Sequence, residues 1–354
     1  MQETRPFFSV VMPVYGVEAY LQDAIDDLCA QTCPDWELIA VDDQSPDGCA
    51  AILERAAAKD GRIRVIAAPE NIGAGAARDL GMRQASGHYI WFADPDDRFD
   101  TSLLACVKAS LEQSPAEAVM FGADEVYFEN GREVSRFRVV PEAAVCGSAD
   151  QVRERVLAWE KQTLYGYTWN KVYSLDAIRA RGVVYEQAAL CEDLFFNVAF
   201  FEQAQSVNVL DAALYAYGKR SGGNLTGRFV PEYYALHRRR IAELYAQQCR
   251  WGQDSAQVRG LLGSLYGRYI FSALSRNCDP RSGMTGKQRT AWCREVFADA
   301  LYQTLLPVAK ADSTVLSVCL WCLRRQWPLL WRAMGRAVYV AQNSQSLQRI
   351  KNKR

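Results

Sequence analysis

The chain has 354 residues, of which 49% are hydrophobic and 23% charged, and its 41 basic residues balance 41 acidic ones. This is the composition of a globular protein long enough for two domains, and the zero net charge gives no indication of nucleic-acid binding. The first residues lead into an apolar segment without a basic-then-apolar leader, so we expect no secretory signal and a cytoplasmic location. The 11 scattered cysteines lack the dense spacing of a disulfide-stapled domain and are expected to be reduced thiols.

Strand and helix patterns alternate over the first third of the chain. Buried apolar runs typical of strands lie at 7–15, 36–42, 63–67 and 89–93. Amphipathic patterns typical of helices follow them at 17–30, 45–59, 71–85 and 101–113. Ser45 before Pro46 is the expected N-cap of the second helix. The alternation predicts an α/β fold with a mainly parallel, doubly wound sheet, whose short connections bring Pro13, Asp42 and Asp94 to one edge.

The alternation weakens after a strand expected at 118–122. Asn130-Gly131 predicts the turn of a β-hairpin. Helix and strand patterns continue at 149–162, 190–203 and 206–217. Residues 219–224, which begin with Lys219 and Arg220, are expected to form a mobile, basic, glycine-rich loop.

From Pro231 the pattern becomes helical throughout. Four helices are expected at 231–251, 255–275, 287–305 and 313–341. We therefore expect a first domain at 1–228 and a separate helical module at 229–354.

The last stretch, 313–354, contains no Asp or Glu and interleaves basic residues with Trp and Leu. Its longest apolar run, 315–323, is far shorter than the ~20 residues that span a bilayer. The pattern suits a helix lying in an anionic membrane surface, which would place the protein peripherally on the cytoplasmic face of a membrane. A packed helix with solvated basic residues, or an oligomer contact, fits the same pattern.

Three carboxylates, Asp94, Asp96 and Asp97, crowd into four positions after the fourth expected strand. Like charges this close repel each other unless a cation lies among them. Mg²⁺ or Mn²⁺, itself bound to diphosphate oxygens, would meet that need with one or two protein carboxylates. A solvated acidic turn that caps the next helix is the alternative for an isolated Asp-x-Asp, so the upstream residues decide.

A bound nucleoside diphosphate needs a metal at its phosphates, an acceptor for its base N–H and ribose hydroxyls, and often a planar cation near the base. Asp94 and Asp96 can supply the metal site, Asp42 the acceptor and Arg78 the cation. The glycines before Arg78 do not form a dinucleotide-binding fingerprint, because they follow the third strand rather than the first and lack the third glycine.

Four motifs in this order resemble those of the family 2 glycosyltransferases of the bacterial polysaccharide-building kind, which have the GT-A fold. The motifs are VMPVY at 11–15, VDDQSPD at 41–47, NIGAGAAR at 71–78 and FADPDD at 92–97. The resemblance covers about residues 6 to 227. It implies a GT-A sheet with flanking helices, a nucleotide-binding half at 1–115 and an acceptor half at 116–228.

The resemblance also implies roles for single residues. Asp42 would bind the base or ribose and Arg78 the base, while Asp94 would lie against the ribose and the metal and Asp96 would coordinate the metal. The remaining residues expected to line the nucleotide pocket are Pro13, Tyr15 and Glu18.

The second half is similar to the family's acceptor region at Trp169-Asn170-Lys171 and at Glu192-Asp193 before Phe195. The family's Glu-Asp motif usually carries the one carboxylate base of an inverting transfer, so Asp193 is the candidate base. As alternatives, the two acids could only serve the dipole of a helix, and Trp169 could be plain core. Lys219 and Arg220 would close over the diphosphate as part of a lid.

Three positions depart from the family pattern: Gly16 replaces a usual Asn, Gln44 a usual Gly and Asp79 a common Asn. None removes a carboxylate from the expected site. The sequence therefore predicts a metal-dependent inverting glycosyltransferase that uses a nucleoside-diphosphate sugar, with UDP as the expected nucleotide, and a glycan or lipid-linked acceptor.

Two alternatives remain. A sugar nucleotidyltransferase would need a basic, glycine-rich loop after the first strand to hold a triphosphate, and residues 13–18 offer no cation there. A membrane-docked relative that keeps the fold without the activity would conserve the same motifs.

Overall fold

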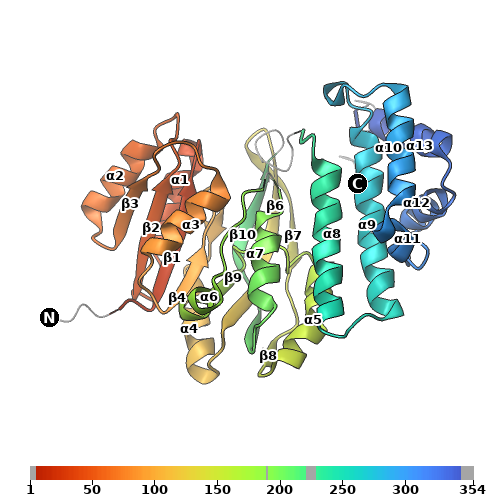
Figure 1. Ribbon diagram of the computed structural model, residues 1–354. Helices are drawn as coiled ribbons and strands as arrows, with labels where there is room; N and C mark the ends of the chain where they lie inside the picture. The colour runs from red at the N-terminus through yellow and green to blue at the C-terminus, as the bar shows by residue number, and fades with distance from the viewer. Residues whose placement is uncertain (1–4, 189, 221–228, 344–354) are drawn as a thin grey trace. The chain divides into compact units, whose positions relative to one another are not determined.

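The computed structural model describes residues 5–188, 190–220 and 229–343. The chain divides into two compact units, Met1–Gly227 and Arg228–Arg354 (Figure 1). The first unit is built on a mixed β-sheet, and the second is helical in its described part.

The sheet of the first unit contains ten strands in the described part of the chain, in the order β3-β2-β1-β4-β9-β6-β10-β5, with β7 added to β6 and β8 to β10. The strands β1 to β4 run parallel to their neighbours in this set, as do β6 and β10, whereas β9 is antiparallel to both β4 and β6. The strands are β1 (Phe8–Val14), β2 (Trp36–Asp42), β3 (Ile63–Ala67), β4 (Tyr89–Phe92), β5 (Arg98–Phe99), β6 (Ala118–Glu129), β7 (Arg132–Val139), β8 (Ala144–Cys146), β9 (Lys171–Ser174) and β10 (Val207–Arg220).

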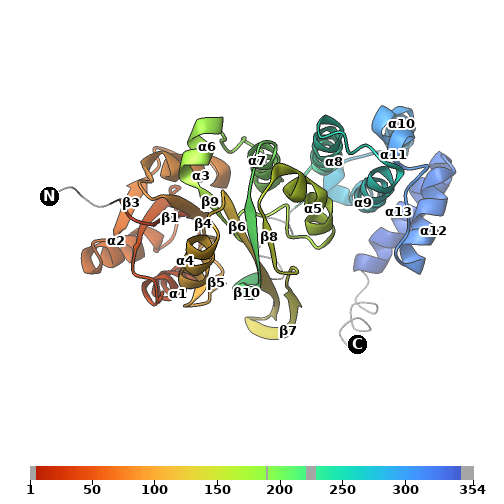
Figure 2. The same ribbon diagram turned by 90° about the horizontal axis from the view of Figure 1, so that it is seen from below.

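Helices cover both faces of this sheet, with α1, α2 and α4 on one side and α3, α6 and α7 on the other (Figure 2). They are α1 (Glu18–Cys29), α2 (Cys49–Lys59), α3 (Ala74–Gln84), α4 (Leu103–Gln113), α5 (Ala149–Lys161), α6 (Leu175–Arg181) and α7 (Glu192–Phe201). Because both faces are covered, every residue of β1 is buried. This confirms the predicted α/β architecture with a mainly parallel first half.

The registers of the parallel strands bring the expected carboxyl ends together. Val14 pairs with Asp42 across β1 and β2, and Val11 pairs with Phe92 across β1 and β4. Helix α3 can approach β1 closely because Gly81 lies against it: a Cβ there would be 2.5 Å from the Cγ1 of Val11. The edge predicted from the alternation is therefore confirmed.

Several local predictions were wrong. Helix α2 begins at Cys49 after Gly48, not at Ser45, because the Ser45 N–H bonds the Asp42 carboxylate in a turn instead. Lys219 and Arg220 end strand β10 rather than beginning a loop, and residues 221–224 of the expected lid lie outside the described residues. The hairpin turn is confirmed, with Asn130 and Gly131 both at positive φ between β6 and β7.

The second unit packs its helices around α9, which contacts α8, α11, α12 and α13. Its helices are α8 (Tyr233–Arg250), α9 (Ala256–Arg276), a short 3₁₀ turn at Pro280–Ser282, α10 (Gly286–Ala298), α11 (Ala300–Leu305), α12 (Thr314–Arg324) and α13 (Pro328–Asn343). The core between them includes the buried side chains of Leu262, Tyr266 and Ile270. No helix in the described part of the chain is long and apolar enough to cross a membrane.

Two of the four helices expected here are each divided in two. Asp299 has an extended backbone, ends α10 and caps α11 with its carboxylate, so 287–305 is not one helix. Helix α12 ends before Pro328, because a proline lacks the N–H that a continuing helix needs and disfavours helical geometry in the residue before it. The helix expected over 313–341 is therefore a helix pair.

Candidate active site

Four carboxylates gather around the carboxyl edge of β4, and three of them face the guanidinium of Arg78. Its Nη2 lies 2.7 Å from Asp94 Oδ1, and its Nη1 lies 3.4 Å from Asp193 Oδ1 and 3.7 Å from Glu192 Oε1. Asp96 follows Asp94 in the same turn. We call Asp94, Asp96, Glu192 and Asp193 the carboxylate cluster. Its members come from the turn after β4 and from the first turn of α7, so the fold joins the two halves of the first unit at this point.

Arg78 is held in place by helix α3 and by the segment before α7. Only 5% of the residue is exposed, and the centre of the Tyr185 ring is 5.4 Å from its Cζ. The segment that carries Tyr185 is itself fixed, because the Tyr185 N–H donates to Asp79 Oδ1 at 2.9 Å. Asp79, one of the departures from the family pattern, therefore supports the position of the guanidinium through an acceptor that the usual Asn would also offer.

Asp97 anchors the turn that carries Asp94 and Asp96. It is 1% exposed and accepts hydrogen bonds from the Tyr215 hydroxyl and the Gly218 N–H, both at 2.7 Å. The Tyr215 hydroxyl also accepts the Asp94 N–H at 3.3 Å. Because both oxygens of Asp97 are engaged with β10, Asp94 and Asp96 are the two of these three acids that remain to meet a ligand.

Burial raises the pKa values of Asp94, Asp96 and Glu192. Burial raises the pKa of Asp94 to about 6, although Arg78 beside it acts in the opposite direction. Burial also raises the pKa of Asp96, against the attraction of Arg220, whose Nη1 is 3.5 Å away. Burial and then the charge of Asp193 raise the pKa of Glu192. A raised pKa means that the ionised form of these three acids is disfavoured unless positive charge lies near them, so the site favours a bound cation.

The cluster fits a divalent metal that is completed by a diphosphate. In the described part of the chain, no three His, Cys, Asp or Glu side chains are arranged to hold a metal ion by themselves. Asp94 and Asp96 nevertheless offer the hard oxygen donors that Mg²⁺ or Mn²⁺ prefers, with 22% and 34% of their side chains exposed. One or two carboxylates are enough where substrate phosphates supply the remaining oxygens.

Asp193 stands at the start of α7 on a strained backbone. Cys191, directly before the helix, has a φ of 69°, a conformation that is costly for a residue with a side chain. One oxygen of Asp193, Oδ2, accepts the Thr168 N–H at 3.3 Å, while Oδ1 is buried without a hydrogen bond among the described residues. The carboxylate is thus positioned by the Thr168 N–H on one oxygen and by the guanidinium of Arg78, 3.4 Å from the other.

A buried lysine shapes the loop that holds Asp193. The Nζ of Lys171 lies 2.5–3.2 Å from four oxygens, those of the Leu164, Tyr165 and Tyr167 carbonyls and the Asn170 side chain. Burial lowers the pKa of Lys171 to about 7, but four surrounding acceptors need the N–H groups of the charged ammonium. The lysine therefore ties the segment before Thr168 into one conformation.

The nucleotide side of the edge is built by the turn after β2. Asp42 Oδ1 accepts the Ser45 N–H at 3.0 Å, and the neighbouring Asp43, 2% exposed, accepts the N–H groups of Ile72 and Gly73 at 2.7 and 2.9 Å. Asp43 thus ties the start of α3 to β2.

The three other residues expected at the nucleotide lie around this turn. Pro13 is buried within β1, and Tyr15 just after it is 48% exposed. Glu18 Oε2 accepts the Gly48 N–H at 2.9 Å, which satisfies the start of α2. Contact of Pro13, Tyr15, Glu18 or Asp42 with a nucleotide stays a prediction.

Three expected roles do not agree with the geometry. Trp169 is 4% exposed and stacks on Tyr215, with ring centres 4.5 Å apart, and Asn170 is fully buried, so neither side chain is available to an acceptor. Arg78 faces carboxylates rather than an open space for a nucleobase. Lys219 pairs with Glu125 at 2.7 Å, an acid that is not part of the cluster. The alternative of plain core, left open for Trp169, is the one that the structure favours.

Four residues that hold the site were not among the residues expected to act in it. Asp43 and Asp97 were visible only as second acids in their motifs, and Lys171 only as part of the segment similar to the family's acceptor region. Tyr215 lay in an apolar strand pattern without any polar signal. Each acts through hydrogen bonds to residues distant in the chain, which spacing along the sequence does not reveal.

Residues 9–182 match the family model "Glycosyl transferase family 2". The uncharacterized glycosyltransferase EpsJ of Bacillus subtilis (strain 168) is 31% identical over 215 residues, which are 60% of this chain and 61% of EpsJ. The poly(ribitol-phosphate) beta-N-acetylglucosaminyltransferase TarS of Staphylococcus aureus (strain MW2) is 27% identical over 241 residues, 65% of this chain and 39% of TarS. The chain thus spans about three fifths or less of these two relatives.

Solved structures match over nearly the whole chain. A crystal structure of S. aureus TarS 1-349 in complex with UDP-GlcNAc aligns with a TM-score of 0.67 at 20% identity, covering 94% of this chain and 91% of that one. A mannosyltransferase from Pyrobaculum calidifontis in complex with GDP-Man and Mn²⁺ aligns with a TM-score of 0.50 at 13% identity, covering 97% and 89%. At these identities the likeness concerns the fold alone. Together with the family model and the carboxylate edge described above, it leads to one assignment: this chain carries a glycosyl transferase family 2 domain, matched at residues 9–182, in a GT-A fold that a helical region follows.

Proposed function

We propose that this chain is an inverting glycosyltransferase that moves a sugar from a UDP-sugar donor to a hydroxyl group of a glycan or lipid-linked acceptor. The observation that carries the proposal is the approach of Asp94 and Asp193 to one guanidinium, that of Arg78, at 2.7 and 3.4 Å. Asp94, expected on the donor side, and Asp193, expected on the acceptor side, therefore contact the same side chain. Transfer between two bound substrates requires such proximity.

Asp193 is the proposed general base. As the acceptor oxygen attacks C1 of the donor sugar, its proton passes to Asp193, the bond from C1 to the diphosphate oxygen breaks, and the electron pair leaves with the diphosphate. Attack opposite the leaving group inverts the anomeric carbon. Glu192 is the second candidate. Because its pKa is raised, a larger share of its carboxyl groups is already protonated near neutral pH and cannot take a proton.

Asp94 and Asp96 are proposed to hold Mg²⁺ or Mn²⁺, which when bound would neutralise the charge of the departing diphosphate. Arg220, next to Asp96 at 3.5 Å, would add a second cation on the same side. The guanidinium of Arg78 keeps the acids of the cluster apart and oriented. The residues proposed to line the nucleotide are Pro13, Tyr15, Glu18 and Asp42.

The relatives support the choice of donor. TarS, which has this fold, was crystallised with UDP-GlcNAc, and the archaeal mannosyltransferase was crystallised with Mn²⁺. UDP-GlcNAc with Mn²⁺ is therefore the first combination to test.

The acceptor side is the less determined half of the proposal. We propose a polymeric or lipid-linked glycan, with residues 313–343 in peripheral contact with a membrane. Residues 344–354, which continue the basic stretch in the sequence, lie outside the described residues.

The test measures binding and turnover separately. UDP with Mn²⁺ should raise the thermal midpoint of the wild type, and removal of the metal by a chelator or by Asp96→Ala should abolish that shift. Slow hydrolysis of UDP-GlcNAc should follow the same pattern. A wild type that shows neither a shift nor hydrolysis with any UDP-sugar would favour the non-catalytic relative.

A further inference from the structure

Helix α13 has one face packed into its own unit and one face open. On the packed face Trp331 is fully buried, and Gly335 lies so close to α9 that a Cβ would be 2.5 Å from the Leu274 carbonyl oxygen. The open face repeats at helical spacing and consists of Leu329, Arg332, Ala333, Arg336 and Val340. Leu329 is 75% and Val340 50% exposed, so this face alternates basic and apolar side chains in contact with solvent.

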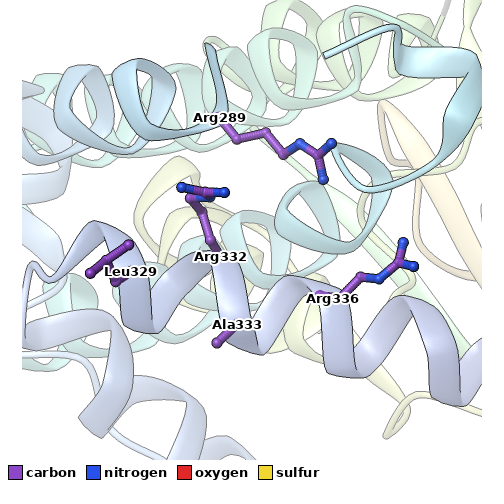
Figure 3. A pocket seen from close by; sticks show the side chains of 5 residues that line it. All are labelled: Arg289, Leu329, Arg332, Ala333 and Arg336. Carbon is purple, nitrogen blue, oxygen red and sulfur yellow. The ribbon is translucent and has the colours of Figure 1, made fainter. Parts of the chain in front are cut away.

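A pocket of about 450 Å³ lies between this open face and helix α10. Three arginines line it, Arg289 from α10 and Arg332 and Arg336 from α13, together with Leu329 and Ala333 (Figure 3). We call it the arginine pocket. Arg289 donates to the Met284 carbonyl oxygen at 2.8 and 3.2 Å, and Arg332 donates to Thr290 Oγ1 at 3.1 Å. These bonds hold two of the guanidinium groups in place but neutralise neither.

No acidic side chain in the described part of the chain lines the arginine pocket. Across residues 5–188, 190–220 and 229–343, the ion pairs found for arginines of the helical unit involve Arg238, Arg239, Arg259, Arg268 and Arg281, not the three in the pocket. The sequence from 313 onward holds no Asp or Glu that could supply one. Guanidinium groups bind phosphate through two parallel hydrogen bonds, so three of them in one hollow form a site for a phosphate group.

Exposed apolar side chains of the same helical unit indicate the source of that phosphate. Seven of the 13 large apolar residues exposed in the described chain lie between 308 and 340: Val308, Val315, Val318, Trp321, Trp327, Leu329 and Val340. Trp327 directly precedes α13 and is 60% exposed, and Leu329 is itself part of the pocket wall. A soluble phosphate would leave these side chains in water, whereas an anionic lipid surface takes up both the apolar residues and the guanidinium charges.

We propose that the arginine pocket binds the phosphate of an anionic lipid headgroup, with Trp327 and Leu329 entering the interface beside it. This inference rests on the proposed membrane contact of the helical unit and gives that contact a defined phosphate site. It does not depend on the donor chemistry of the other unit.

The test uses the full chain and vesicles of phosphatidylcholine with or without phosphatidylglycerol. Arg289→Gln, Arg332→Gln and Arg336→Gln are combined in one variant, and the control combines Arg55→Gln, Arg132→Gln and Arg155→Gln, three exposed arginines of the first unit. Both variants lose the same charge. At about 1 kcal/mol per basic residue at the surface, the pocket variant should bind the anionic vesicles about a hundredfold more weakly, and the control should bind within about threefold of the wild type.

A second variant, Trp327→Ser with Leu329→Ser, isolates the apolar contribution without touching the arginines. Both side chains are more than half exposed, so the fold should remain, which the thermal midpoint checks. It should also weaken binding to anionic vesicles. Equal binding by the pocket variant and its control would overturn the proposal. So would a shift from oligomer to monomer in the serine variant without any vesicle binding, because the face would then contact a second copy.

Inorganic phosphate separates the two sources of the anion. It should compete with anionic vesicles only weakly, because it lacks the apolar part of the ligand. If phosphate alone stabilises the wild type but not the pocket variant, and vesicles bind neither, the pocket takes a soluble phosphate and the lipid proposal is wrong. Hydrolysis of UDP-GlcNAc without vesicles reports on the proposed function independently.

Discussion

The carboxylate cluster and the arginine pocket carry charges of opposite sign, and they differ in how far those charges are buried and paired. In the cluster, four acids are largely withdrawn from water; three of them face the buried guanidinium of Arg78, and the fourth, Asp96, lies beside Arg220. In the pocket, three guanidinium groups line an open hollow, and no acid among the described residues lines it with them. The segments that carry the cluster are held by hydrogen bonds from β10 to Asp97, from Tyr185 to Asp79 of α3, and from Thr168 to Asp193. The arginines of the pocket are held by two contacts, to the Met284 carbonyl and the Thr290 hydroxyl.

This difference indicates what each region is built to do. Chemistry requires groups that stay in one geometry while charge moves, so burial and many hydrogen bonds are worth their cost in desolvation. Attachment to a surface requires charges that remain accessible and can adapt to many headgroup positions. The predictions below test this contrast, starting with the largest expected effect.

Replacing the proposed base should have the largest effect. Asp193→Asn keeps the size of the side chain and the hydrogen bond from Thr168 but cannot take a proton, so transfer from UDP-GlcNAc should fall by about 10² to 10⁴-fold. Affinity for UDP should remain, which calorimetry with Mn²⁺ checks. Binding to anionic vesicles should not change.

Asp211→Asn, an exposed acid on β10, is the matched control and should keep full activity. If Asp193→Asn retains activity within about tenfold while Glu192→Gln loses it, the base is Glu192.

Removing the buried ammonium should destabilise the first unit. Lys171→Met removes four hydrogen bonds of a charged donor, so the carbonyl oxygens of Leu164, Tyr165 and Tyr167 are left with the amides of Asn170 and Asn197 as donors. The expected cost is on the order of 3 kcal/mol in the free energy of unfolding, measured in urea. Transfer should also slow, because the loop before Thr168 orients Asp193. Lys161→Met, at the exposed end of α5, serves as control. An unchanged unfolding free energy for Lys171→Met would mean that the four contacts carry no net stability.

The two regions should respond differently to pH. The pKa of Asp94 is raised to about 6, so its carboxylate takes up a proton as the pH falls through that value and loses its attraction for Arg78 and for a metal. Turnover should therefore fall by about tenfold per pH unit below about 6. Guanidinium groups stay protonated over this range, so vesicle binding should remain constant from about pH 5 to 8. If turnover and vesicle binding changed with pH in the same way, the proposed contrast between the two regions would be wrong.

The smallest effect is expected at Gln44, in the turn after β2. Its φ is 60°, in the left-handed region, and its side-chain amide donates to the Ala68 carbonyl oxygen. In Gln44→Gly the relaxed backbone offsets the lost hydrogen bond, so the unfolding free energy should change by less than about 1 kcal/mol. Gln44→Val should lose about 2 kcal/mol, because a β-branched residue fits this region poorly. Equal stability of the two variants would contradict the left-handed conformation.

Much of the fold was predictable because its signals are local. The apolar runs of β1 to β4, the alternation with helices and the Asn130-Gly131 turn depend on residues near each other in sequence, and all were confirmed. The helices expected over 287–305 and 313–341 failed at Asp299 and Pro328, where a single capping or helix-breaking residue overrides a continuous apolar pattern.

The sequence alone determined which acids end the strands and that they share one edge, because period and topology follow from apolar patterning. Only the tertiary structure decided the partners of those acids. It turned Arg78 toward Asp94 and Asp193, engaged Asp97 with β10 and buried Trp169. Such pairings depend on side chains brought together from distant segments, and their energies are set by burial, which no spacing along the chain encodes.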